Sequence, residues 1–146
     1  MGTKPTDANN KLDTLCSVGA DLLGVVFDNN GNSYAIEFTI NSDGKTYSGF
    51  IRSLDLTTRT LGPQSPLNFT GGAKIYQEGS GDVVMTPPGQ LFFIVDNKLF
   101  TPDYKSYNGA GNPITCTYID TVINSATGYY VGLTYADGEM VSAYSG

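Results

Sequence analysis

Residues 24–36 run Gly-Val-Val-Phe-Asp-Asn-Asn-Gly-Asn-Ser-Tyr-Ala-Ile: a short apolar stretch, a turn that ends in glycine, and a second apolar stretch. Asn and Asp favour turn geometry and Gly accepts a positive φ, so this pattern predicts a β-hairpin. The same pattern returns at residues 82–94 and 132–142, with turn glycines 58 and 49 residues apart. This spacing favours a repeated structural unit, and three unrelated hairpins are the alternative.

Further strand signals follow the first hairpin. Residues 49–56 are a predicted strand, Thr57-Thr58-Arg59 turn the chain, and Thr60-Leu61 begin another segment. Pro63 and Pro66 predict an edge position for that segment, because proline cannot donate to a sheet ladder.

The second hairpin is followed by strand signals in the same order. Residues 98–101 form a predicted strand, and residues 103–113 form a loop rich in Gly, Asn and Pro. Residues 114–122 then alternate like an outer strand. Each unit is therefore predicted to contain four strands.

These runs resemble a blade of the bacterial β-propellers. In those blades an apolar strand, a D-x-x-G turn and a Tyr-containing strand precede a strand that ends Leu-Asp-x-Thr-Thr, which residues 25–36 and 50–60 match. The second unit matches through residues 83–94 and 98–100, but has Thr-Pro-Asp-Tyr at residues 101–104 in place of that ending. The resemblance implies an all-β fold of repeated four-stranded antiparallel blades. It implies no particular activity, because propellers host lectins, scaffolds and enzymes alike.

The resemblance covers about residues 12–146 and predicts the domain organisation. We expect a polar leader at residues 1–10 and a blade array at residues 11–146, in which residues 11–18 are the last strand of a preceding blade. Two full blades and half of a third follow. Propellers typically close with four to eight blades, so this ring is incomplete within one chain. The missing blades belong either to a longer protein or to further copies of this chain.

Composition excludes several functional classes. The 146 residues contain no His and carry a formal net charge of -6. Without His the chain lacks the side chain that most often serves as a general base and as a zinc ligand. The negative charge disfavours nucleic acid as a partner. The longest apolar run, residues 91–95, is far too short for a membrane span.

The two cysteines, Cys16 and Cys116, match no metal-ligand spacing. They form either one disulfide or two buried thiols. The segment Asp28-Asn29-Asn30-Gly31-Asn32 resembles the start of a calcium loop, but a tight turn requires the same residues and we favour the turn. We therefore predict no metal and no cofactor.

A tyrosine-rich region is the predicted ligand-binding site. Its residues are Tyr104, Tyr107, Asn108, Asn112, Tyr129 and Tyr130. Aromatic rings stack on the apolar faces of sugars, and Asn side chains bind hydroxyl groups. Aromatic packing between blades is the alternative role for the tyrosines.

No catalytic site is predicted, because no spacing brings a chosen pair of carboxylates together. We expect a non-enzymatic, extracellular or surface-located binding module for a protein or glycan partner, which associates with itself as a homo-oligomer. There are two alternatives. The chain could be a structural assembly subunit of a virus or a surface appendage, or a fragment of a larger propeller enzyme.

Overall fold

The computed structural model describes residues 21–122 and 128–145. Its strands are β1 (Asp21–Phe27), β2 (Ser33–Ile40), β3 (Tyr47–Asp55), β4 (Thr60–Leu61), β5 (Ser65–Phe69), β6 (Gly81–Met85), β7 (Leu91–Val95), β8 (Lys98–Pro102), β9 (Ile114–Thr121), β10 (Tyr129–Ala136) and β11 (Glu139–Ser145). The only helices in these two ranges are the short 3-10 turns η1 (Thr70–Gly72) and η2 (Tyr104–Ser106). Neither could cross a membrane. The predicted all-β class is confirmed.

All three predicted hairpins are present. They pair β1 with β2, β6 with β7, and β10 with β11. Their turn glycines Gly31, Gly89 and Gly138 have φ values of 82°, 92° and 80°. Glycine adopts this left-handed region without a steric cost, which is why each turn ends in glycine.

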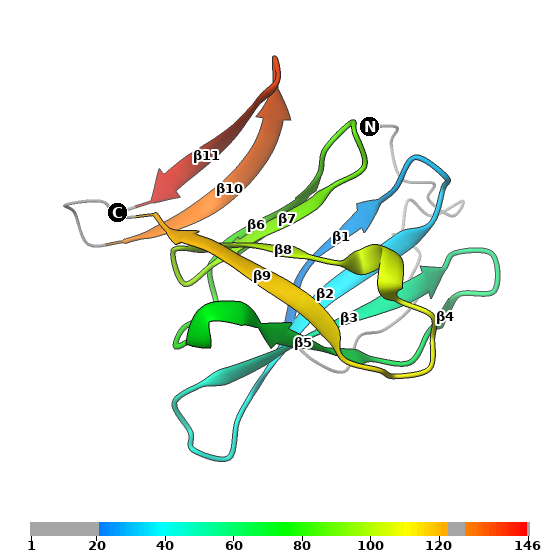
Figure 1. Ribbon diagram of the computed structural model, residues 1–146, viewed down its shortest axis with the longest axis horizontal. Coiled ribbons are helices and arrows are strands. Elements are labelled where there is room, and N and C mark those ends of the chain that lie inside the picture. Colours follow the sequence, from blue (N-terminus) through cyan, green and yellow to red (C-terminus); the bar gives the residue numbers. More distant parts are fainter. Residues whose placement is uncertain (1–20, 123–127, 146) are drawn as a thin grey trace, which may run out of the picture.

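The large sheet joins both predicted four-stranded units (Figure 1). Its strand order is β1-β2-β3-β5-β9-β8-β7-β6, with β4 pairing only with β3. Within each unit the neighbours are antiparallel, and the units meet through the parallel pair β5 and β9. Blades of a propeller are instead four-stranded sheets set around a central channel. The described chain is thus a mixed, nearly barrel-shaped sheet.

The two ends of this strand order lie against each other without a hydrogen-bonded ladder. A Cβ atom on Gly24 of β1 would lie 2.3 Å from Val83 Cγ1 of β6, and one on Gly81 would lie 2.9 Å from Leu23 Cδ1. Only glycine permits so close an approach. The contact between β1 and β6, which we call the seam, almost closes the barrel.

The predicted edge position of the segment after β3 holds for Thr60 and Leu61, which form β4 and pair only with β3, but it is wrong for β5. Strand β5 lies between β3 and β9, although it contains Pro66. Ser65 and Pro66 pair with β3, whereas pairing with β9 begins one residue later, at Leu67. Because the two neighbours use different parts of the strand, the missing N–H of proline does not interrupt a ladder on both sides.

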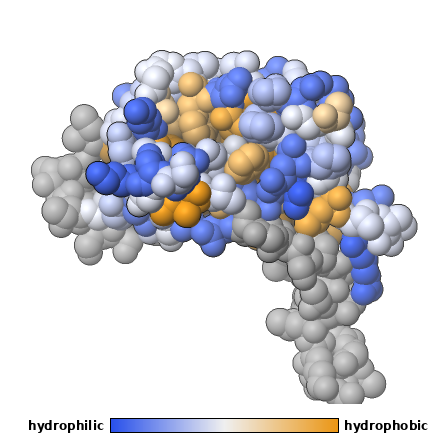
Figure 2. Space-filling model, turned by 90° about the horizontal axis from the view of Figure 1, so that it is seen from below, coloured by the Kyte–Doolittle hydropathy of each residue, from blue (hydrophilic) through white to orange (hydrophobic). Residues whose placement is uncertain are grey.

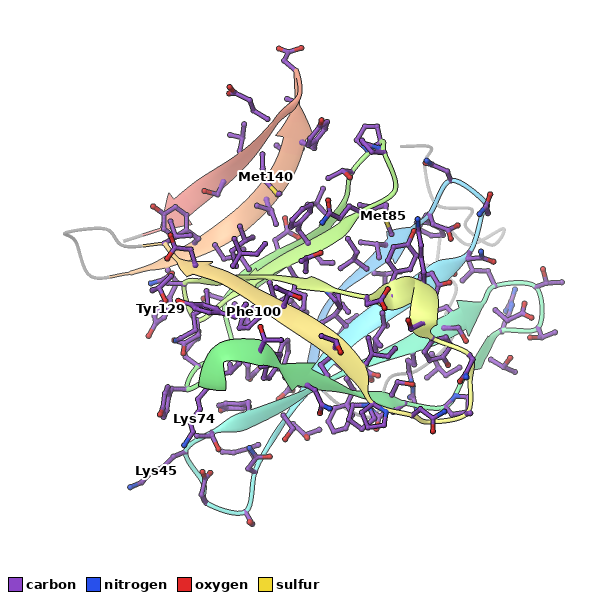
Figure 3. The ribbon with its side chains drawn as sticks, viewed as in Figure 1. Lys45, Lys74, Met85, Phe100, Tyr129 and Met140 are labelled. Atoms are coloured by element: carbon purple, nitrogen blue, oxygen red, sulfur yellow. The ribbon has the colours of Figure 1, made fainter. Side chains whose placement is uncertain are left out.

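The core fills the barrel interior with aromatic and aliphatic side chains. The ring centroid of Phe93 lies 5.1 Å from that of Phe100 and 6.0 Å from that of Phe38. Phe100 lies on β8, as labelled in Figure 3, and is fully buried. Cys116 of β9 is a buried free thiol in the same cluster, while Cys16 lies outside the described residues.

The third hairpin forms a separate two-stranded sheet beside β6 and β7 (Figure 1). The Leu133 N–H donates to Asp82 Oδ2 of β6 at 2.9 Å, and the Tyr130 N–H donates to Asn97 Oδ1 at 2.9 Å. The predicted leader at residues 1–10 and the predicted strand at residues 11–18 lie outside the described residues. Figure 2 shows a mostly hydrophilic face with separate hydrophobic patches.

Candidate functional site

The strand directions bring several turns and loops to one end of the barrel. These are the turns at residues 28–32, 55–59 and 86–89 and the loop at residues 103–113, which together we call the loop end. Asn29 Nδ2 donates to the Pro87 carbonyl at 2.8 Å and so joins the turns at residues 28–32 and 86–89. The Tyr107 hydroxyl donates to the Pro63 carbonyl at 2.8 Å and so joins the loop at residues 103–113 to the segment between β4 and β5.

Three tyrosines form a cluster at the loop end. The Tyr34 ring contacts Tyr104 and Tyr107 edge to face, with centroid distances of 5.3 and 6.0 Å. Such aromatic pairs contribute about 0.5–1.5 kcal/mol each beyond the area they bury. The Tyr104 hydroxyl donates to the Gly89 carbonyl at 3.1 Å, and the Tyr107 hydroxyl lies 3.2 Å from Ser53 Oγ. Rings and hydroxyl groups are therefore both held in place.

Two open grooves flank this cluster, each of about 430 Å³. The first groove is lined by residues 31–34 and 53–57 and by Tyr107. The second groove is lined by residues 88–91 and 101–105 and by Thr117. Both carry hydroxyl and carboxylate groups beside a tyrosine ring, which suits a polar ligand with an apolar face.

Burial raises the pKa of both Tyr34 and Tyr104, and the nearby Asp28 carboxylate raises it further. Their phenol groups therefore remain protonated well above neutral pH. A protonated phenol both donates and accepts a hydrogen bond.

The Asp28 carboxylate maintains its own turn. Its Oδ1 atom accepts the N–H groups of Asn30 and Asn32 at 3.0 and 2.8 Å. Burial alone would raise the pKa of Asp28, but hydrogen bonds from the Asn32 side chain and from the two backbone N–H groups outweigh it, so the pKa is lowered. These contacts agree with the predicted turn.

Asp55 does the same for the turn after β3. Its Oδ1 atom accepts the N–H groups of Thr57 and Thr58 at 2.9 and 3.0 Å.

In the described ranges no three acidic or cysteine side chains gather as a metal site requires. The loop end is therefore built for hydrogen bonding.

The structure separates the predicted ligand-binding residues into two groups. Tyr104 and Tyr107 lie in the loop end, and Asn108 and Asn112 are exposed in the same loop between β8 and β9. Tyr129 and Tyr130 instead begin β10, beside the turn between β7 and β8 at the opposite end of the sheet. Figure 3 shows Tyr129 far from η2.

Sequence reasoning missed Tyr34, Ser53 and Asp55, which line the first groove. Tyr34 directly follows the turn of the first hairpin. The repeated hairpins place their turns at one end of the sheet, so the position of Tyr34 next to a turn could have indicated that it lies at this end. Nothing in the sequence links it to Tyr104 or Tyr107.

No family model, no curated protein and no solved structure matches this chain. The function is therefore inferred from the geometry of the loop end.

Proposed function

We propose that the chain is a binding module whose loop end recognises a glycan. The observation that carries this proposal is the Tyr34–Tyr104–Tyr107 cluster between two open, polar grooves. A sugar ring offers C–H groups on its faces and hydroxyl groups at its edge. An aromatic ring beside hydroxyl and carboxylate groups complements both features.

The chemistry of the first groove favours a sugar over a charged ligand. Asp55 is ionised at neutral pH because the Thr58 N–H, the largest influence, lowers its pKa together with the Thr57 N–H. A fixed negative charge repels anions and accepts hydrogen bonds from hydroxyl groups. Ser33, Ser53 and Thr57 add hydroxyl groups to the same groove.

We propose a non-enzymatic role for the same reasons. The chain contains no His. Asp28 and Asp55 each accept backbone N–H groups of their own turn, and ionised carboxylates of this kind are poor proton donors at neutral pH. These carboxylates support turn formation and ligand binding rather than acid catalysis.

We propose that each four-stranded unit, which consists of a hairpin and the two strands that follow it, is related to a β-propeller blade. Self-association, a surface or extracellular location and a structural assembly role stay predictions from the sequence. An incomplete ring of blades would leave an unpaired strand edge that promotes association, whereas β1 and β6 lie against each other within one chain.

A titration of the full-length ¹⁵N-labelled chain with maltohexaose, cellohexaose and chitohexaose tests the proposal. We expect shifts in backbone amides of the loop end with at least one sugar. Replacement Tyr34→Ala should weaken that binding about fivefold to tenfold, the equivalent of one lost aromatic contact. Tyr76→Ala is the control, because Tyr76 is exposed at the opposite end, where its N–H binds Asp96. Equal effects of both substitutions, or no shifts with any sugar, would refute glycan binding at this end.

A further inference from the structure

Asparagine is followed directly by glycine at Asn30-Gly31 and at Asn108-Gly109, and both pairs lie at the loop end. The backbone nitrogen that follows an asparagine can attack the side-chain amide, and glycine has no side chain to obstruct this approach. Both asparagines are exposed, and the glycines have similar φ values of 82° and 76°. A Cβ atom on either glycine would meet nothing beyond the neighbouring residues within 4 Å. Sequence, exposure and free space are therefore matched at the two sites.

Hydrogen bonding holds the first site in an unreactive arrangement. The Gly31 N–H donates to the Asp28 carbonyl at 3.2 Å, and the Asn30 N–H donates to Asp28 Oδ1 at 3.0 Å. The Gly31 nitrogen must therefore leave its turn before it can attack. The ionised Asp28 carboxylate also opposes the loss of a proton from nearby N–H groups.

The second site has the opposite arrangement. The Ala110 N–H donates to Asn108 Oδ1 at 2.9 Å, which folds the side-chain amide of Asn108 back over the peptide that contains the Gly109 nitrogen. Among the described residues, no acceptor binds the Gly109 N–H. The attacking nitrogen is thus free, the Asn108 Cγ atom lies on its side of the turn, and the carbonyl oxygen already has a donor.

We propose that Asn108 is a site of spontaneous modification, at which asparagine becomes aspartate and isoaspartate, whereas the turn protects Asn30. Hydroxide removes the Gly109 N–H proton and the nitrogen forms a bond to Asn108 Cγ. The negative charge moves to Oδ1, where the Ala110 N–H stabilises it. The bond from Cγ to Nδ2 then breaks, and the leaving nitrogen takes a proton from water, which releases ammonia and regenerates hydroxide. Water finally opens the cyclic imide at either carbonyl.

The products change the charge of the loop end. The net reaction consumes one water and releases one ammonia, and it leaves a carboxylate in place of a neutral amide. Isoaspartate also adds a methylene group to the backbone. The new charge lies next to Tyr107, whose ring contacts Tyr34. The reaction itself does not depend on whether the loop end binds a glycan.

Peptide mapping by mass spectrometry measures both sites in one sample of the full-length chain, incubated at mildly alkaline pH. We expect Asn108 to react about tenfold faster than Asn30 in the folded chain, because one backbone hydrogen bond changes a barrier by about this factor. In urea the turn and the contact to Ala110 are both lost, so the two rates should agree within about twofold.

A pair of variants isolates the hydrogen bond to Asn108. Ala110→Pro removes the N–H donor, whereas Ala110→Ser keeps it and is the matched control. In the folded chain Ala110→Pro should slow the reaction of Asn108 about tenfold, and Ala110→Ser should leave it unchanged. The rate at Asn30 reports whether each variant is still folded. In urea both variants should react at the rate of the parent chain.

Three results would overturn the proposal. One is an equal rate at Asn108 and Asn30 in the folded chain. Another is a faster rate at Asn108 that persists unchanged in urea, because the preference would then come from the neighbouring sequence. The third is an equal rate at Asn108 in the folded Ala110→Pro and Ala110→Ser variants.

Discussion

The seam between β1 and β6 makes a sharp prediction about Gly24. In Gly24→Ala the new methyl group would lie 2.3 Å from Val83 Cγ1, more than 1 Å inside ordinary van der Waals contact. Valine has a stiff side chain, so the two strands must separate. Overpacking of this kind costs about 1–3 kcal/mol, and we expect a loss of about 2 kcal/mol in the free energy of unfolding.

Removal of the opposing side chain should reverse this effect. In a Val83→Ala background the clash disappears, and Gly24→Ala should then be neutral or stabilising by up to about 1 kcal/mol, because alanine loses less backbone entropy than glycine on folding. The coupling energy between the two positions is therefore about 2–3 kcal/mol. Val84→Ala is the control, because Val84 adjoins Val83 on β6 and faces away from it.

Urea unfolding followed by circular dichroism measures all five variants and the parent chain. Two results would show that β1 and β6 do not meet. One is that the costs of Gly24→Ala and Val83→Ala are additive, and the other is that Gly24→Ala couples equally with Val84→Ala. The sheet would then be an open one, and the barrel description would be wrong.

Three more predictions follow from burial and hydrogen bonding. Phe100→Ala should cost about 3–5 kcal/mol in urea unfolding, against less than about 1 kcal/mol for the exposed Tyr76→Ala, and similar costs would contradict the assigned core. A hydrogen bond from a threonine hydroxyl is the main reason that the pKa of Asp43 is lowered. The ionised Asp43 therefore stabilises the fold above the unfolded pKa of about 4, and this contribution is lost as pH falls through the folded pKa. Asp43→Asn should therefore flatten the acid limb of the stability–pH curve, and an unchanged limb would refute this. In a Cys16→Ser chain, Cys116 should resist a thiol reagent at pH ~8 until urea unfolds the protein, because burial raises the pKa of its thiol. Prompt reaction in the folded state would contradict the burial of Cys116.

The sequence was most informative about features that depend on neighbouring residues. Asp28 and Gly31 form their turn through contacts within five residues, so the turn could be predicted from its letters. The alternation of residues 114–122 also predicted a strand, which is β9, since side chains of a strand point to opposite faces in turn.

Strand order depended on contacts that the sequence does not encode locally. Pro66 indicated an edge, but β5 has two neighbours because each uses a different part of it. The parallel pair of β5 and β9 joins residues such as Leu67 and Ile114, which are distant in sequence. No turn specifies a pairing over that distance, and sheet curvature and core packing select it.

By itself the sequence determined the all-β class, the three hairpins and the strands that follow the first two, because turn chemistry and twofold side-chain alternation are local properties. The tertiary structure alone decided that the two four-stranded units share one barrel-like sheet, with glycines at the seam. It also decided that Tyr34 meets Tyr104 and Tyr107 while Tyr129 lies at the other end. Those contacts join residues about 70 positions apart, and only the order and direction of the strands bring them together.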